Sequence, residues 1–221
     1  MDLKEAMQAR HSVRQYKDRP LSVEVIAALQ EEIADCNRES GLHIQLVTNE
    51  PRAFDGFMAH YGKFSGVTSY LALIGNKGPE LDEKCGYFGQ RLVLKAQQLG
   101  LNTCWVAMSY TKIKTAFTVD KGEKLCVVIA LGYGATQGVP HKSKPFSQVA
   151  KADGQIPDWF KNGVEAALLA PTAMNQQKFL LTLKGDKVSA KAGRGFYTKL
   201  DLGIVKYHFE LGAGKDRFAW A

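Results

Sequence analysis

The chain has 221 residues, of which 45% are hydrophobic and 23% charged, a composition typical of a globular domain with an ordinary apolar core. Its 29 basic and 22 acidic residues give a net charge of +7, which favours an anionic partner. The basic residues form no run, and no zinc-finger, RNA-recognition or basic-helix motif is present, so we expect no nucleic-acid partner.

The four cysteines, at positions 36, 85, 104 and 126, form no CxxC pair and are followed by no histidine at a metal-binding spacing. We therefore expect free thiols in a reducing compartment, with neither a disulfide nor a metal site. The first ten residues lack the apolar stretch of a signal peptide, and no segment approaches the ~20 continuous apolar residues of a membrane span. These features predict a cytoplasmic protein without a membrane partner.

The first part of the chain predicts two helices and two strands. Apolar spacing indicates a short helix at residues 2–9. A longer helix follows a basic segment, with Ser22 as a suitable N-cap. Residues 43–49 alternate and are rich in strand-forming types, and residues 68–76 have the composition of a more buried strand.

A helix over residues 86–100 is expected at the centre of the fold. Its apolar face is broad, which is typical of a helix packed on several sides, and Gly100 is a suitable stop. The remaining predicted elements, in order, are an extended piece at 102–106, a small helix at 111–117, a buried strand at 123–134, a helix at 157–170, a loop at 171–177, a hairpin at 178–192 turning at Gly185-Asp186, and a helix at 201–214.

This order predicts an α+β sandwich with a mostly antiparallel sheet flanked by helices. The succession of basic loop, helix and strand occurs twice along the chain. We therefore expect one domain over residues 1–221, built from two pseudo-equivalent halves at roughly 1–78 and 123–221, which the central helix segment 79–122 joins.

Two basic clusters and one polar loop are candidates for a binding site. In an extended "RHSVR" segment, Arg10, Ser12 and Arg14 would point to one side, and guanidinium and hydroxyl groups suit a phosphate. Taken alone, such a cluster is more often a solvated basic loop. The second cluster, "HKSKP", contains Lys142 and Lys144. The polar loop "APTAMNQQ" lies between apolar elements, where it suits the edge of a heterocycle or a polyol chain.

Together these segments resemble the FMN-dependent nitroreductase family. That family has an Arg-x-Ser-x-Arg-x-aromatic segment, matched at residues 10–16, and an Ala-Pro-Ser/Thr-x-x-Asn-x-Gln loop, matched at 170–177. It also has an A-x-x-L-G-L-x-T-x-W segment, matched at 96–105, and a core strand ending in ALGY, matched at 130–133. The resemblance covers most of the chain and implies the fold of that family.

The position of the Pro-Thr-Asn loop departs from the usual family order. In ordinary members the loop follows the second helix, and two subunits clasp each flavin between them. Here it comes late, near residue 171, which resembles a branch of nitroreductases in which one chain mimics the dimer. The resemblance then implies one FMN per chain between the two halves, in a monomer that acts as a pseudo-dimer, with a homodimer as the alternative.

The resemblance also implies roles for single residues. Arg10 and Ser12, next to His11, would hold the FMN phosphate with help from Lys142 or Lys144. Arg14, and Lys63 less specifically, would face the pyrimidine edge of the flavin. The remaining expected cofactor contacts are the backbone near flavin N5 at Ala107 and Met108, and the ribityl and ring contacts of Pro171, Thr172 and Asn175.

The function that this resemblance implies is an FMN-dependent oxidoreductase that uses NADH or NADPH to reduce nitro compounds, quinones or a similar small oxidant by ping-pong hydride transfer. The flavin carries the chemistry, so no catalytic side chain is expected beyond Arg14 as an electrostatic tuner. Many family members have a Glu where this chain has Ala107. An FMN protein that destroys flavin or removes halogen is therefore an alternative, and a basic, non-enzymatic nucleic-acid or phosphate-binding module is a third.

Overall fold

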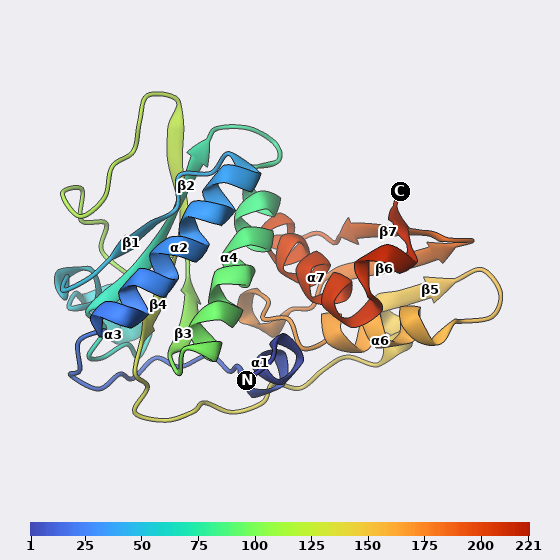
Figure 1. The fold of residues 1–221 in the computed structure, drawn as a ribbon, viewed down its shortest axis with the longest axis horizontal. Coiled ribbons are helices and arrows are strands. Elements are labelled where there is room, and N and C mark those ends of the chain that lie inside the picture. Colours follow the sequence, from blue (N-terminus) through green and yellow to red (C-terminus); the bar gives the residue numbers. More distant parts are fainter. The chain divides into compact units, whose positions relative to one another are not determined.

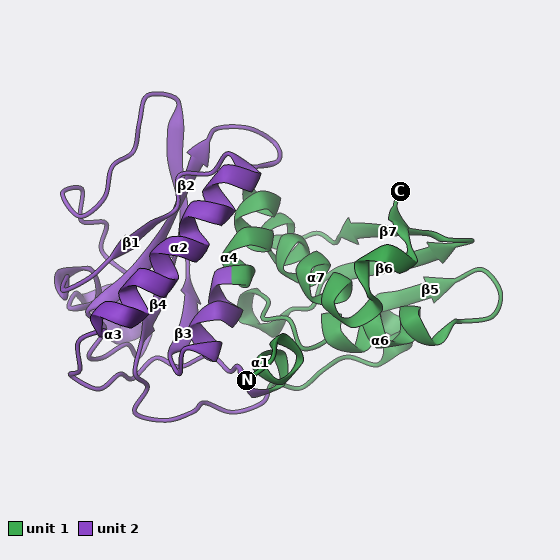
Figure 2. Ribbon diagram, viewed as in Figure 1, with its two compact units in different colours: residues 1–8, 82–91, 141–221 green, residues 9–81, 92–140 purple.

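The computed structural model describes all residues, 1–221, and forms two compact units (Figure 2). Unit 1 consists of residues 1–8, 82–91 and 141–221, and unit 2 of residues 9–81 and 92–140. Both units combine segments that are distant in sequence. This division differs from the expected halves at 1–78 and 123–221, because residues 123–132 pair with strands of unit 2.

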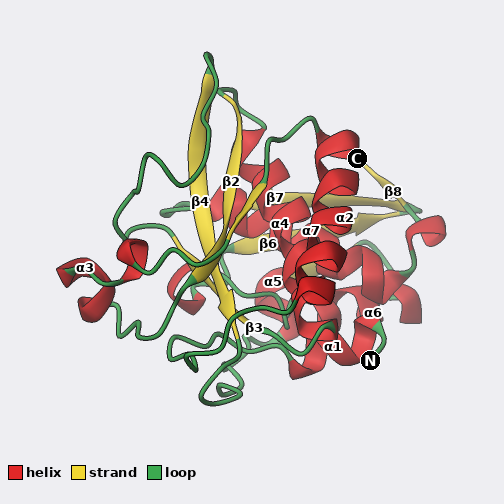
Figure 3. Ribbon diagram, turned by 60° about the vertical axis from the view of Figure 1, so that its left-hand side comes forward, coloured by secondary structure: helices red, strands yellow, loops and turns green.

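Unit 2 contains a fully antiparallel sheet with the strand order β1-β2-β4-β3. Strands β2 and β4 are its longest pair, and they lie side by side in Figure 3. Every residue of β2 except Asn76 is buried, as its continuous apolar sequence predicts. The strands are β1 (Gln45–Val47), β2 (Ser69–Asn76), β3 (Asn102–Val106) and β4 (Glu123–Gly132).

Helix α2 (Val23–Ser40) lies beside this sheet and contacts strand β1 (Figure 1). The Ser22 hydroxyl accepts the Val25 N–H at 3.4 Å and caps the helix, as expected. The helix ends at Gly41, whose φ of 70° is the left-handed conformation that favours glycine. The other helices of this part of the chain are α3 (Phe57–Tyr61), the single 3₁₀ turn η1 (Arg52–Phe54), and α4 (Leu81–Gln98), which continues from unit 1 into unit 2.

Unit 1 contains a mixed sheet with the order β5-β6-β7-β8. Its centre is the predicted hairpin, in which β6 and β7 pair antiparallel around Gly185 (φ 61°), while β5 and β8 pair parallel to their neighbours. The strands are β5 (Ala150–Ala152), β6 (Phe179–Lys184), β7 (Lys187–Ala192) and β8 (Ala219–Trp220).

Helices α6 (Asp158–Ala167) and α7 (Thr198–Ala213) pack closely in unit 1. Small residues allow this approach, because a Cβ atom at Gly163 would lie 2.6 Å from the Phe209 ring. Phe160 and Phe209 meet edge to face at 5.7 Å in the core between them. The remaining elements are α1 (Leu3–Ala9), α5 (Phe146–Val149) and the 3₁₀ turns η2 (Ala173–Asn175) and η3 (Lys215–Arg217).

The two units share an order of elements. Along the chain, the antiparallel strands β1 and β2 of unit 2 come after α2 and before α4. In the same way, the antiparallel strands β6 and β7 of unit 1 come after α6 and before α7. The repeat of basic loop, helix and strand expected from the sequence, and the equivalence of two halves, stay predictions. The predicted α+β fold, with antiparallel strands flanked by helices, is confirmed, although the strands form two sheets. None of the helices combines the length and apolarity needed to cross a bilayer.

The small helix predicted at 111–117 is wrong. This segment forms one turn, in which the Ala116 N–H donates to the Ile113 carbonyl, and its Thr111 N–H donates to Ala53 instead. Its apolar residues, Phe117 above all, pack against the aromatic core of unit 2. Packing therefore overrides the local helical pattern. The four cysteines are free thiols, three of them buried.

Candidate functional site

The basic segment at residues 10–16 lies along strand β3 in unit 2. Ser12 forms a parallel bridge with Thr103 of that strand. On its other side the segment meets Ser65, whose N–H donates to the Arg14 carbonyl at 3.0 Å, while the Tyr16 N–H donates to the Ser65 carbonyl at 2.9 Å. The segment is therefore held by backbone pairing on both sides, and it is not a loose basic loop.

Tyr16 anchors the end of this segment. Its buried hydroxyl donates to the Val13 carbonyl at 2.7 Å, and burial raises the pKa of the phenol well above its usual value. Gly66 makes room for the chain here, since a Cβ atom at that position would lie 2.3 Å from the Tyr16 carbonyl oxygen. Gly66 also has a φ of 69°, so it is a glycine for two independent reasons.

Arg10, Ser12 and Arg14 gather around Cys104 of β3. The thiol is hydrogen-bonded to Ser12 and lies within electrostatic range of both guanidinium groups. Burial nevertheless raises the pKa of this thiol, so it stays neutral at pH 7. The three predicted residues thus share one neighbourhood, but they are not equivalent, because Arg10 is buried whereas Ser12 and Arg14 are exposed.

Arg10 carries a buried positive charge. Only 3% of the residue is exposed, and its Nε atom has no hydrogen-bond partner. Burial lowers the pKa of the guanidinium to about 10, which leaves it charged at neutral pH. A buried guanidinium with an unpaired donor destabilises the fold unless an anion accepts its hydrogen bond and balances its charge. His11, next to it, packs near Gly138, where a Cβ atom would lie 2.7 Å from the His11 Cβ.

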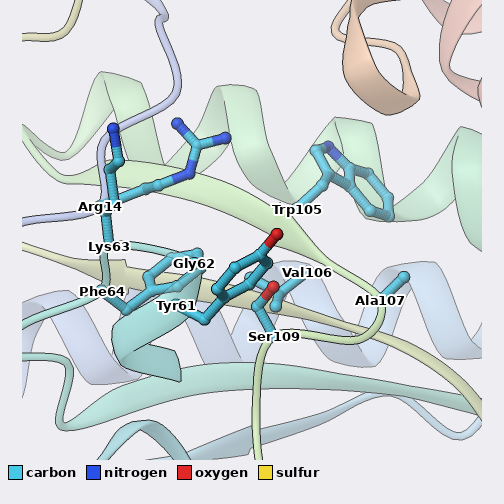
Figure 4. A pocket seen from close by; sticks show the side chains of 9 residues that line it. All are labelled: Arg14, Tyr61, Gly62, Lys63, Phe64, Trp105, Val106, Ala107 and Ser109. Atoms are coloured by element: carbon cyan, nitrogen blue, oxygen red, sulfur yellow. The ribbon is translucent and has the colours of Figure 1, made fainter. Parts of the chain in front are cut away.

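A pocket of about 400 Å³ opens in unit 2 beside this segment (Figure 4). It brings together three of the predicted site residues, Arg14, Lys63 and Ala107. Met108 is 69% exposed and is not part of the lining. The remaining lining residues are Tyr61, Gly62, Phe64, Trp105, Val106 and Ser109. Its size and mixed apolar and polar walls are typical of a small-molecule site.

Three segments build this pocket, and the sequence indicated only part of it. Arg14 comes from the basic segment, residues 61–64 from the end of α3, and residues 105–109 from the end of β3 and the loop beyond it. Tyr61 and Ser109 were missed. They carry no motif, and only the contact between α3 and the 105–109 segment makes them neighbours.

The other predicted residues lie in two loops of unit 1 that form hydrogen bonds with each other. The first loop contains Lys142 and Lys144, and the second consists of residues 171–177. The Lys144 ammonium donates to the carbonyls of Gln176 and Gln177 at 2.8 and 3.0 Å. In return, the Asn175 side-chain amide donates to the Lys142 carbonyl at 2.9 Å. Lys144 is thus engaged with backbone, whereas Lys142 is exposed. Pro171 and Thr172 open the second loop, and the Thr172 hydroxyl accepts the Gln177 N–H at 3.0 Å.

The second loop is conformationally strained. Met174, Asn175 and Gln177 have φ angles of 50°, 54° and 45°, in the left-handed region that costs about 1 kcal/mol or more for a residue with a side chain. Such strain persists only where surrounding contacts enforce it. Met174, at the tip, is 87% exposed. The loop therefore presents a fixed shape to its surroundings.

Asp201 of α7 is one of the contacts that enforce this shape. Its carboxylate accepts the Ala173 N–H at 2.9 Å and the Gln176 side-chain N–H at 2.7 Å. Burial raises the pKa of this carboxyl to about 6, although both hydrogen bonds oppose the shift. No sequence motif indicates this role, because Asp201 lies 25 residues or more from the groups that it holds.

One group of side chains, His43, Asp120 and Glu123, has potential metal-ligand atoms within 4.8 Å of one another. The Gln45 amide is oriented by Thr118, to which it both donates and accepts, so its N–H faces His43 Nε2. His43 Nε2 must then accept, and Nδ1 carries the proton that it donates to Glu123 at 2.9 Å. The nitrogen nearest the carboxylates is therefore protonated, and the group acts as a hydrogen-bonded brace.

Comparison with protein families gives a match over nearly the full length. The model of the family described as "Putative TM nitroreductase" matches residues 2–213, nearly the whole chain. A comparison with curated proteins finds no match.

Solved structures have the same fold. A putative nitroreductase from Thermotoga maritima is 22% identical, with a TM-score of 0.66, over 98% of this chain and 85% of that one. A putative NADH dehydrogenase/NAD(P)H nitroreductase from Parabacteroides distasonis is 22% identical, with a TM-score of 0.53, over 66% of this chain and 95% of that one. A putative nitroreductase from Desulfovibrio desulfuricans, in complex with FMN, is 19% identical, with a TM-score of 0.52, over 67% and 94%.

Proposed function

Because the chain belongs to the family described as "Putative TM nitroreductase", we propose that it is an FMN-dependent oxidoreductase that takes electrons from NADH or NADPH and reduces a small oxidant such as a nitro compound or a quinone. The relative from D. desulfuricans is a complex with FMN, and the name of the P. distasonis relative includes NAD(P)H, which supports both parts of the proposal. When bound, FMN supplies the hydride chemistry.

The observation that carries this proposal is the buried guanidinium of Arg10. Its Nε donor has no partner, and its neighbour Cys104 is a neutral thiol that cannot balance the charge. A phosphate is dianionic and accepts several hydrogen bonds, so it would supply both the missing acceptor and the missing charge. Ser12, which shares the Cys104 neighbourhood, would donate a further hydrogen bond to the phosphate.

The pocket beside this segment would hold the flavin ring. Phe64, Trp105 and Val106 would provide apolar walls that keep water from the ring. Arg14 also lines the pocket and carries a positive charge. The reduced ring carries negative charge along its N1–C2=O edge, which Arg14 would stabilise. The nicotinamide and the oxidant would then use the same open space in turn, which predicts ping-pong kinetics.

The loops of unit 1 enter this proposal only through the family resemblance. Pro171, Thr172 and Asn175 would contact the ribityl chain and ring, and Lys142 would assist at the phosphate. Lys144 already donates to two carbonyls, which makes it the weaker candidate of the two lysines. A cytoplasmic location and a pseudo-dimeric monomer remain part of the proposal, and sedimentation of the FMN-loaded protein tests the oligomeric state.

A flavin titration of the purified protein tests the proposal. We expect a yellow protein that releases FMN on denaturation, or an apoprotein that binds added FMN. Arg10→Met should weaken FMN binding by about tenfold or more, the value of a charge-assisted hydrogen bond, while leaving stability unchanged or raised because an unpaired buried charge is gone. Arg38→Met is the matched control, since Arg38 is an exposed residue paired with Asp35.

Two results would contradict the proposal. One is a parent protein that binds no FMN. The other is an Arg10→Met variant that binds FMN as tightly as Arg38→Met does. Bleaching of the bound flavin by NADH or NADPH without oxygen tests the reductant separately, and its failure would favour the alternative flavin chemistries over nitro or quinone reduction.

A further inference from the structure

The pocket of unit 2 carries more positive charge than the proposed flavin edge requires. We propose that it selects an oxidant that is a planar aromatic anion, such as an aromatic carboxylate, and that Lys63 is the residue that determines this selectivity. The inference rests on the proposed function, because it names the class of the second substrate.

The charge of the lining is one-sided. Arg14 and Lys63 are both cationic, and none of the nine lining residues carries a carboxylate. Figure 4 shows the guanidinium of Arg14, the ammonium of Lys63 and the hydroxyl of Tyr61 extending to the same side of the pocket. These groups, together with the Ser109 hydroxyl, can all donate hydrogen bonds. A ligand that fits them must therefore offer acceptor oxygens and benefits from a negative charge.

We assign the flavin edge to Arg14 alone, although the family resemblance placed Lys63, less specifically, at the same edge. The reduced ring takes one negative charge on its N1–C2=O edge, and Arg14 matches the family position that faces this edge. The charge of Lys63 then remains unbalanced within the pocket. In a partly enclosed site, an uncompensated cation raises the local concentration and the affinity of anions.

The backbone of Lys63 supports a role for its side chain. Its φ of 62° lies in the left-handed region, where glycine is favoured over a residue with a side chain. The turn is defined by two hydrogen bonds, from the Lys63 N–H to His60 and from the Phe64 N–H to Ala59, both at 2.9 Å. The lysine at this position is therefore held in an unfavourable conformation at the wall of the pocket. Strain of this kind clusters at binding sites.

Aromatic side chains make the pocket suitable for a flat ligand. Tyr61, at the end of α3, is 78% exposed, and its ring forms part of the pocket wall. Phe64 is buried beneath the Arg14 guanidinium, with 6.0 Å between Cζ and the ring centre, and Trp105 lies across the pocket from Tyr61 (Figure 4). Aromatic rings at the wall and the rim favour stacking with a planar substrate.

The overall reaction of such an oxidant balances with the proposed reductant. A nitrobenzoate, NAD(P)H and one proton give a nitrosobenzoate, NAD(P)⁺ and water. The nitro group gains two electrons and loses one oxygen as water, and the nicotinamide loses a hydride. The carboxylate takes no part in the chemistry, so its effect isolates recognition by Lys63.

Equilibrium binding of benzoate and benzamide tests the inference without turnover. The two ligands have nearly the same shape and differ in charge. Isothermal titration of the FMN-loaded protein and of the apoprotein should give at least about tenfold tighter binding of benzoate, and the preference should fall when the salt concentration rises. In Lys63→Met, whose side chain has a similar length, the preference should fall toward unity in the FMN-loaded protein, and it should fall in part in the apoprotein, where Arg14 remains as a second cation.

Matched variants keep the test decisive. Lys112→Met removes an exposed lysine of the same unit that does not line the pocket, and it should keep the preference. Lys63→Gly relieves the backbone strain, so it provides a folded variant even if Lys63→Met is unstable. Equal binding of benzoate and benzamide to the parent would overturn the inference, as would a preference that both substitutions at Lys63 leave unchanged.

Turnover separates this inference from the proposed function. With the parent enzyme, kcat/KM for 4-nitrobenzoate should exceed that for 4-nitrobenzamide by about tenfold, and Lys63→Met should remove the difference mainly through the nitrobenzoate value. If neither compound is reduced and no FMN binds, the proposed function fails, and the titrations of the apoprotein still decide the charge selectivity. If both are reduced equally, the function stands and the inference fails.

Discussion

Gly62 and Ser109 stand in contact at the pocket, and the contact leaves no room for a side chain on Gly62. A Cβ atom at Gly62 would lie 2.6 Å from Cβ and 2.9 Å from Oγ of Ser109. Gly62 has an ordinary negative φ, so close approach rather than conformation requires the glycine. This approach joins the end of α3 to the segment after β3 and thereby closes one side of the pocket.

Gly62→Ala should separate these two segments. Overpacking of this kind costs about 1–3 kcal/mol of the free energy of unfolding, and FMN affinity should fall because the pocket widens. Gly78→Ala is the matched control, since a Cβ atom there would meet nothing within 4 Å. Adding Ser109→Gly to Gly62→Ala should restore stability. Urea unfolding measures these effects, and equal stability of Gly62→Ala and Gly78→Ala would contradict the prediction.

The buried carboxyl of Asp201 should give the protein a distinct pH dependence of stability. Its pKa in the folded protein is about 6, against 3.8 for an ordinary aspartate, so folding favours the protonated form. The contribution of Asp201 to the free energy of unfolding is therefore complete below pH 4 and is lost as the pH rises through 6. The loss amounts to about 3 kcal/mol at full ionisation.

Asp201→Asn should remove this dependence. The difference in unfolding free energy between parent and variant should change by about 3 kcal/mol between pH 3.5 and 7, in the direction that makes the variant relatively more stable at pH 7. For Asp153→Asn, at an exposed position, the unfolding free energy should change with pH in parallel with that of the parent. Urea titrations over this pH range measure the difference, and parallel profiles for Asp201→Asn would disprove it.

Lys144 should contribute to stability where Lys142 does not. Its ammonium donates to the carbonyls of Gln176 and Gln177, and charged hydrogen bonds of this kind contribute about 1.5–3 kcal/mol. Lys144→Met should therefore cost about 2 kcal/mol of unfolding free energy, whereas Lys142→Met should stay within about 0.5 kcal/mol. Faster amide exchange of residues 171–177 in Lys144→Met would locate the effect, and an unchanged exchange rate would refute it.

The fold was predictable where burial and capping act locally. The continuous apolar run of β2 and the Ser22 cap of α2 specify their elements from neighbouring residues alone. The segment at 111–117 has a helical pattern too, but Phe117 packs into the aromatic core and the turn ends there. Contacts distant in sequence decide such a segment, and no local pattern contains them.

The candidate site, too, could be predicted from local sequence motifs but not from contacts between distant segments. The motif around Arg10 and Arg14 identified the basic segment, yet alternation along an extended chain predicted one shared side for residues that differ in burial. Tyr61 and Ser109 could not be predicted, because a contact across about 50 residues of sequence creates their part of the pocket. Asp201 was missed for the same reason, since its partners lie on a separate loop.

The charge of Arg14 should set the reduction potential of the bound flavin. Removing a cation near the N1–C2=O edge disfavours the reduced, negatively charged ring, so Arg14→Gln should lower the midpoint potential. A loss of roughly 1.4 kcal/mol, reasonable for an exposed charge, corresponds to about 30 mV for a two-electron couple. Arg14→Lys keeps the charge and should stay near the parent value.

Arg19→Gln is the control for this measurement. Arg19 belongs to the same unit and stacks on the Tyr133 ring at 4.0 Å, as Arg14 lies over Phe64 at 6.0 Å, but it does not line the pocket. Anaerobic titration against a reference dye gives the potentials of all four proteins. A potential of Arg14→Gln equal to that of Arg19→Gln would mean that the Arg14 cation does not act on the flavin edge, and the orientation proposed for the ring would have to be abandoned.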